Sequence, residues 1–116
     1  MKRQIIITTQ FEALHNWPGA RGHVQYDYLA DPHRHMFKVK LAKTVHGDDR
    51  DIEFIELKRD VNFFIANEYG SSANKVTNIG HQSCEMIAER LLNAFAADWV
   101  EVFEDGENGA RVETTL

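Results

Sequence analysis

The histidines are the residues whose types and spacing point most directly to chemistry. His33 and His35 open a run of alternating apolar and polar residues, so both side chains should point to one face of a strand, roughly 6.5–7 Å apart along the backbone. Two imidazoles that lean together can bind one ion at about 2.0–2.1 Å. His15 ends a second strand-like run, on its apolar side. If these strands are neighbours, three histidines converge and leave a fourth coordination position open, as in catalytic zinc sites.

The same spacing has a second interpretation. A histidine pair in a strand also arises by chance, with one ring bonded to a carbonyl in the core and the other exposed, because the pair alone is weakly specific. His23, His46 and His81 lie in loop-like sequence and are expected to be solvated. A three-histidine set also does not identify the metal, since zinc, nickel and iron all accept imidazole ligands.

Three strands are expected to position the histidines. Residues 4–15 and 33–46 alternate as half-buried strands do and favour an antiparallel pair, joined by an irregular connection rich in Gly and Pro. Residues 99–106 form a short strand that runs into an acidic turn, and a further strand around Val112 would complete the sheet.

Two helices lie between these strands in the sequence. Apolar residues recur at helical spacing from Ile52, with Asp51 as the expected cap and Gly70 as the end. After a loop over 70–82, a second helix begins at Gln82 or Ser83. Its apolar stripe is Met86, Ile87, Leu91 and Phe95. The order β-β-α-α-β predicts an α+β fold with helices covering one face of an antiparallel sheet.

Length and composition limit the class of protein. The 116 residues suggest a single domain spanning 1–116, with 43% hydrophobic and 27% charged residues as in ordinary globular proteins. The net charge of −5 gives no reason to expect a nucleic-acid partner. The single cysteine, Cys84, excludes an internal disulfide and fits a reducing compartment. Apolar runs are too short for a signal peptide or a membrane span, so we expect a soluble cytoplasmic protein with no membrane partner.

Five segments, in the order FEALH, HRH, IEFIELK, SCEMIAERL and VEVFED, carry a resemblance to a known family. The chain resembles the 6-pyruvoyl-tetrahydropterin synthase family, and within it the branch of 6-carboxytetrahydropterin synthase, the queuosine-pathway enzyme. That family shows F-x-A-A-H, then H-G-H, a D-F-x-x-L-K helix start, P-T-S-E and a final strand ending in E-T. The resemblance spans roughly residues 5–112.

The resemblance implies an architecture. Members have the tunnelling fold, in which each subunit gives a four-stranded antiparallel sheet with two helices on one side. Three subunits close a barrel, and two trimers commonly stack into a hexamer. The chain is therefore expected to be a homo-oligomer, a trimer or hexamer, with sites between subunits.

The resemblance also assigns roles to residues. It assigns zinc to His15, His33 and His35. It makes Glu104 the carboxylate that anchors a pterin, whose 2-amino and N3–H groups match two carboxylate acceptors. Glu85 matches the glutamate of P-T-S-E, and Ser83 and Cys84 replace its threonine and serine, so the resemblance implies that Glu85 and Ser83 also bind the substrate and that Cys84 approaches it. Without the family resemblance, Glu104 is interpreted as a solvated acid in a turn. Glu85 is then interpreted as an acid at a helix N-terminus that interacts favourably with the helix dipole.

The sequence departs from the family in its proton-transfer groups. The family cysteine four residues before H-G-H is Leu29 here, and the family Asp-His pair aligns with Tyr69 and Gly70. The proton-transfer groups are therefore missing at their expected places, since Leu29 cannot carry a proton and Gly70 has no side chain. The central glycine of H-G-H is Arg34, which should point away from the metal.

Substitutes for the missing groups lie nearby. We consider His81, Cys84 and Asp31 as catalytic candidates, with Asp27 and Tyr28 in the same loop as Asp31. Cys84 at a helix N-terminus could have a lowered pKa, or could be a small buried residue.

Three functions follow from these expectations. The first is a zinc-dependent lyase, breaking a carbon–oxygen or carbon–carbon bond of 7,8-dihydroneopterin triphosphate or a related pterin. The second is a catalytically inactive paralogue that binds a pterin or purine through the metal site and Glu104. The third is an oligomer in which the metal has a purely structural role.

Overall fold

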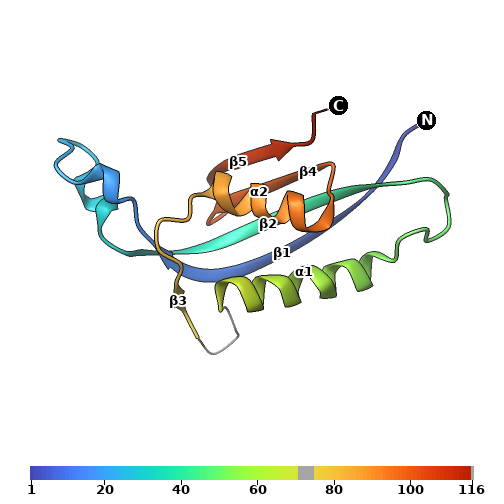
Figure 1. Cartoon of the computed structure of the whole chain (residues 1–116), viewed down its shortest axis with the longest axis horizontal. Helices are drawn as coiled ribbons and strands as arrows, with labels where there is room; N and C mark the ends of the chain where they lie inside the picture. Colours follow the sequence, from blue (N-terminus) through green and yellow to red (C-terminus); the bar gives the residue numbers. More distant parts are fainter. Residues whose placement is uncertain (71–74, 116) are drawn as a thin grey trace.

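The structure is a computed structural model that describes residues 1–70 and 75–115. Its elements are β1 (Arg3–His15), β2 (His33–Val45), α1 (Phe54–Tyr69), β3 (Thr77–Asn78), α2 (Cys84–Phe95), β4 (Trp99–Glu104) and β5 (Asn108–Glu113) (Figure 1). The connection between β1 and β2 extends from one end of the sheet and contains two single turns of 3₁₀ helix, Pro18–Ala20 and Asp27–Ala30.

The sheet is open and mixed, with strand order β3-β1-β2-β4-β5. Its four longer strands are antiparallel to their neighbours, as predicted, and β5 is the strand expected around Val112. The predicted count of four is wrong, because Thr77 and Asn78, within the expected loop, pair in parallel with Ala13 and Leu14. The α+β class is confirmed, and the oligomeric barrel stays a prediction.

Both helices pack on one face of the sheet and share one core with it. The fully buried sheet residues include Phe37, Leu41 and Val100, and α1 adds Val61 while α2 adds Leu91. The opposite face of β2 carries exposed lysines and an exposed arginine, as its alternation predicts. Neither helix in the described ranges is long and apolar enough to cross a membrane.

The first helix begins later than the sequence suggests. Asp51 does not cap it, because its carboxylate accepts from the backbone N–H of His46 at 3.0 Å. The cap is Glu53, whose side chain accepts from the N–H of Ile55 at 2.9 Å. The predicted end is confirmed, since Gly70 has the positive φ of 63° that ends helices.

The second helix begins where the sequence places it. Ser83 is its cap, and its hydroxyl accepts from the N–H of Met86 at 3.1 Å. Ile87 and Leu91 are buried as predicted, but Met86 is 43% exposed and does not belong to the buried stripe. Met86 faces the pocket described below instead.

Candidate metal centre

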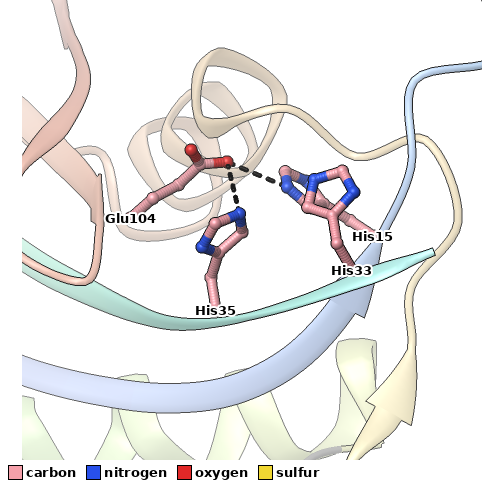
Figure 2. Close-up of side chains that lie close together, drawn as sticks. All are labelled: His15, His33, His35 and Glu104. Atoms are coloured by element: carbon pink, nitrogen blue, oxygen red, sulfur yellow. Dashed lines mark ion pairs between the residues drawn. The ribbon is translucent and has the colours of Figure 1, made fainter. Parts of the chain in front are cut away.

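Strand register brings the three predicted metal ligands together. His15, the last residue of β1, pairs directly with His33, the first residue of β2, and His35 lies opposite Ala13. Directly opposed residues of antiparallel strands have Cβ atoms about 4.5–5.5 Å apart, close enough for side chains to meet. The neighbouring strand β4 ends at Glu104, opposite Phe37, and its carboxylate reaches the same place. Figure 2 shows the four side chains converging.

The distances at this centre suit one metal ion. One ligand atom from each of His15, His33, His35 and Glu104 lies within 4.8 Å of all the others. Glu104 Oε2 is 2.8 Å from His15 Nε2 and 3.7 Å from His35 Nε2. In a tetrahedral zinc site the ligand atoms are about 3.4 Å apart, as bond lengths of about 2.05 Å require. The two distances lie on either side of that value, and every other distance between the four ligand atoms is at most 4.8 Å.

The hydrogen bonds of the Nδ1 atoms determine which nitrogen of each ring faces the centre. Nδ1 of His15 lies 2.7 Å from the carbonyl oxygen of Gln82, and Nδ1 of His33 lies 2.9 Å from that of Asp31. Nδ1 of His35 lies 2.7 Å from Oδ2 of Asp105. These oxygens only accept hydrogen bonds, so each Nδ1 must carry a proton. In the neutral rings the Nε2 lone pairs then face the centre, as metal-binding histidines require.

A buried polar atom supports the fit to a cation. His15 is 8% exposed, and within the described residues its Nε2 has no partner with hydrogen-bond geometry. The nearby Glu104 oxygen satisfies only the distance of an ion pair. With Nδ1 protonated, a neutral His15 places a lone pair against a carboxylate, which is unfavourable at this distance. A divalent cation between the two groups would remove that conflict.

A tight turn holds the acidic side of the centre. Asp105 and Gly106, between β4 and β5, both have positive φ, 56° and 76°, as type I′ turns require. The Asp105 carboxylate accepts from the N–H of Met36 at 2.9 Å, and the Asp105 N–H donates to the Met36 carbonyl at 2.8 Å. The hydrogen bond from His35, with that from Met36, lowers the pKa of Asp105. The sequence predicts an acidic turn here but assigns no role to Asp105, and Asp-Gly after a strand was the available signal.

A pocket of about 940 Å³ opens beside the metal centre. Its lining includes most of the residues predicted for the site: His15, His33, His81, Ser83, Cys84, Glu85 and Glu104. Trp17, Leu29 and Met86 supply apolar walls. The structure therefore brings two of the three predicted metal ligands, His15 and His33, to one cavity with Glu104 and the start of α2, while His35 does not line it.

Asp31 is not among the residues that line the pocket. Its carboxylate is exposed and pairs with Arg21 at 2.5 Å, while its backbone carbonyl accepts from His33. Asp31 therefore supports a metal ligand through its main chain. The geometry offers nothing for its predicted catalytic role.

Cys84 lines the pocket but is not an activated thiol. Burial, together with smaller contributions from the carboxylates of Glu104 and Glu85, raises its pKa to about 12. The proposed lowering by the helix N-terminus is therefore wrong. The thiol stays protonated at neutral pH, because the negative groups and the loss of solvent outweigh the helix dipole.

The structure shows where the three residues that align with the family's proton-transfer groups lie. Leu29 lines the pocket, where it adds only apolar surface. Tyr69 is buried in the core and stacks on Phe11, with ring centroids 5.5 Å apart. Gly70 is the residue that ends α1. Tyr69 and Gly70 border a separate, smaller hollow and do not line the pocket.

Comparisons with known proteins bear on the fold alone. No family model matches the chain, and no curated protein matches it. Among solved structures, the crystal structure of an uncharacterized protein from Wolinella succinogenes is similar, with a TM-score of 0.62 over 99% of each chain and 12% sequence identity. At this identity the likeness shows the fold alone.

Proposed function

We propose that the protein binds one divalent transition metal, zinc by preference, and acts on a pterin as a lyase of the 6-pyruvoyl/6-carboxytetrahydropterin synthase type. The observation that carries the proposal is the convergence of three imidazole rings and a carboxylate beside a pocket that His15, His33 and Glu104 help to line. A metal bound there supplies Lewis acidity that polarises a substrate oxygen.

The pocket has features that suit a planar heterocycle. The Trp17 side chain lines it and is 51% exposed, so its ring is available for stacking. Glu104 offers two acceptor oxygens for the amino and N3–H groups of a pterin. Because Oε2 of Glu104 lies beside His15 and His35, this role requires the carboxylate to rotate away from the histidines when the ligand enters.

Proton transfer would fall to groups at the start of α2. His81 and Glu85 are exposed and line the pocket, so either can accept a proton from a bound ligand. Cys84, protonated at neutral pH, can only donate. His81 is the better candidate base, because histidine is the side chain that most often serves in general acid–base catalysis.

A second candidate function is binding of a pterin without turnover. Leu29 in the pocket and the raised pKa of Cys84 favour it, since neither residue replaces the family's proton-transferring cysteine. The metal centre and Glu104 would then serve recognition alone.

Assembly and location belong to the same proposal. We propose a homotrimer or hexamer in the cytoplasm. Among the described residues β5 is an edge strand of the sheet, which supports a further strand pairing. Light scattering coupled to size exclusion would test the assembly, and a monomer at micromolar concentration would contradict it.

The activity is tested with zinc-loaded protein and two dihydropterins, 7,8-dihydroneopterin and its triphosphate. Chromatography of the pterin products measures turnover, and pterin fluorescence measures binding. Turnover that disappears in His33→Ala and persists in His46→Ala supports the lyase. Saturable binding without turnover supports the second candidate, and no binding of either pterin contradicts both.

A further inference from the structure

The three histidines of the metal centre are fixed in place by contacts outside it. Each ring forms a hydrogen bond at its Nδ1, to the backbone carbonyl of Gln82 or Asp31 or to the carboxylate of Asp105. Outer partners of this kind set the direction of a metal-binding ring. The three rings therefore keep their direction whatever else binds at the centre.

Glu104 reaches the centre through contacts of another kind. Its Oε2 lies 2.8 Å from Nε2 of His15 and 3.7 Å from Nε2 of His35, so the carboxylate is directed at the rings themselves (Figure 2). Nε2 of His15 is a buried atom, and Oε2 of Glu104 is one of the atoms packed against it. An ion bound to that nitrogen would therefore lie against the Glu104 carboxylate.

The charge of Glu104 suits a place among the metal ligands. Imidazole lone pairs and a carboxylate oxygen repel one another at these distances, whereas a divalent cation attracts all of them. The side chain of Glu104 is 30% exposed and that of His15 only 10%, so the centre is shielded from much of the solvent. A cation that loses its water there is stabilised by a charged ligand, because the carboxylate offsets part of its charge.

The pocket gives the Glu104 side chain a route away from the metal. Glu104 lines the pocket beside the centre, so a molecule that enters the pocket can contact its carboxylate. Turning the carboxylate into the pocket would break its contacts with His15 and His35. It would leave intact the hydrogen bonds at Nδ1 of the three rings. One ligand of the centre can therefore leave while the other three stay.

We infer that Glu104 is a fourth, exchangeable ligand of the metal. It binds the ion in the ligand-free protein and leaves when a molecule with an oxygen or nitrogen donor enters the pocket. The inference rests on the proposed metal site and concerns the regulation of that site. The resemblance implies contact between Glu104 and the ligand alone. The two roles follow one another in time, since the carboxylate that leaves the metal turns into the pocket.

Zinc affinity tests whether Glu104 is a ligand. Competition with a chromogenic chelator should give Glu104→Gln a Kd for zinc at least about tenfold higher than that of wild type, because loss of even an outer partner typically costs about 10–100-fold. Glu104→Asp keeps the charge but draws the carboxylate back by one methylene group, so it should also bind zinc more weakly. Glu107→Gln is the matched control, since it removes the same charge from an exposed position in the same hairpin. Wild-type affinity in either Glu104 variant would overturn the inference.

Exchange is tested with imidazole, a neutral nitrogen donor, on the cobalt-loaded full chain. The visible spectrum of bound cobalt reports a change of ligand. Imidazole should bind Glu104→Gln at least about tenfold more tightly than wild type or Glu107→Gln, because it no longer has to displace a carboxylate from the metal. Equal imidazole affinity in the three proteins would overturn the exchange.

Neither measurement uses a pterin, so the inference and the proposed activity can fail separately. A chain that binds zinc equally well with and without the Glu104 carboxylate would overturn the inference and leave the metal site and the lyase proposal in place. A wild-type chain that binds no zinc would overturn the metal site and the inference together.

Discussion

Replacing Asp105 with asparagine should weaken zinc binding without changing the fold. Asp105 is the only side chain that orients a ring of the centre, since backbone carbonyls orient the other two among the described residues. An asparagine side chain keeps the shape, tolerates the positive φ of 56°, and can still accept from the Met36 N–H. The substitution removes the charge that polarises His35. Loss of such an outer partner typically costs 10–100-fold in metal affinity, so we expect a Kd for zinc higher by about that factor.

Competition with a chromogenic chelator measures this Kd. Asp48→Asn is the matched control, because it removes the same charge from an exposed turn far along the chain from the centre. Circular dichroism of the metal-free proteins should show equal helix and strand content. A zinc affinity for Asp105→Asn within about twofold of the control would refute the reasoning that Asp105 holds His35 for a metal.

Other perturbations test the fold around the site. Gly109→Ala should destabilise the protein by about 2 kcal/mol or more in urea unfolding, because a Cβ there would lie 2.1 Å from the carbonyl oxygen of Val102; unchanged stability would contradict the close approach of β4 and β5. Leu41→Ala, at a side chain with 0% exposure, should cost about 2–5 kcal/mol by the same measurement, and a cost under about 1 kcal/mol would contradict its place in the core. Burial tends to raise the pKa of Asp98, but two side-chain hydrogen bonds outweigh it and the pKa is lowered. Its contribution is therefore present above about pH 4 and lost as the pH falls through the folded-state pKa. Asp98→Asn should cost about 1 kcal/mol at pH 7, with the difference from wild type shrinking below about pH 4; a pH-independent difference would contradict this.

Two-residue periodicity predicts that the three histidines lie on the apolar faces of their strands. Two-residue alternation put His33 and His35 on one face with the apolar residues of β2, and the same rule put His15 with the apolar residues of β1. The short apolar pattern also predicted both helices, because burial of one stripe against the sheet determines them. The pattern does not show that the two strands pair with His15 opposite His33, so that pairing had to be assumed.

Features that depend on tertiary contact were not predictable in the same way. The pairing of Thr77 with Ala13 adds β3 without any strand-like run in the sequence. Asp105 is one acid of an acidic turn, and only the register of β4 beside β2 brings it to His35. The thiol of Cys84 has its pKa raised because it is buried near two carboxylates, a balance that a helix-start position alone does not reveal.

Metal stoichiometry tests the central claim most directly. Protein loaded with zinc, passed through a desalting column and measured by plasma mass spectrometry should contain about one zinc per chain, as one three-histidine centre requires. The double variant His33→Ala/His35→Ala should contain almost none, while His23→Ala/His46→Ala, which removes two histidines outside the centre, should match wild type. Absence of zinc from the wild-type protein, or full occupancy in the first double variant, would contradict the account.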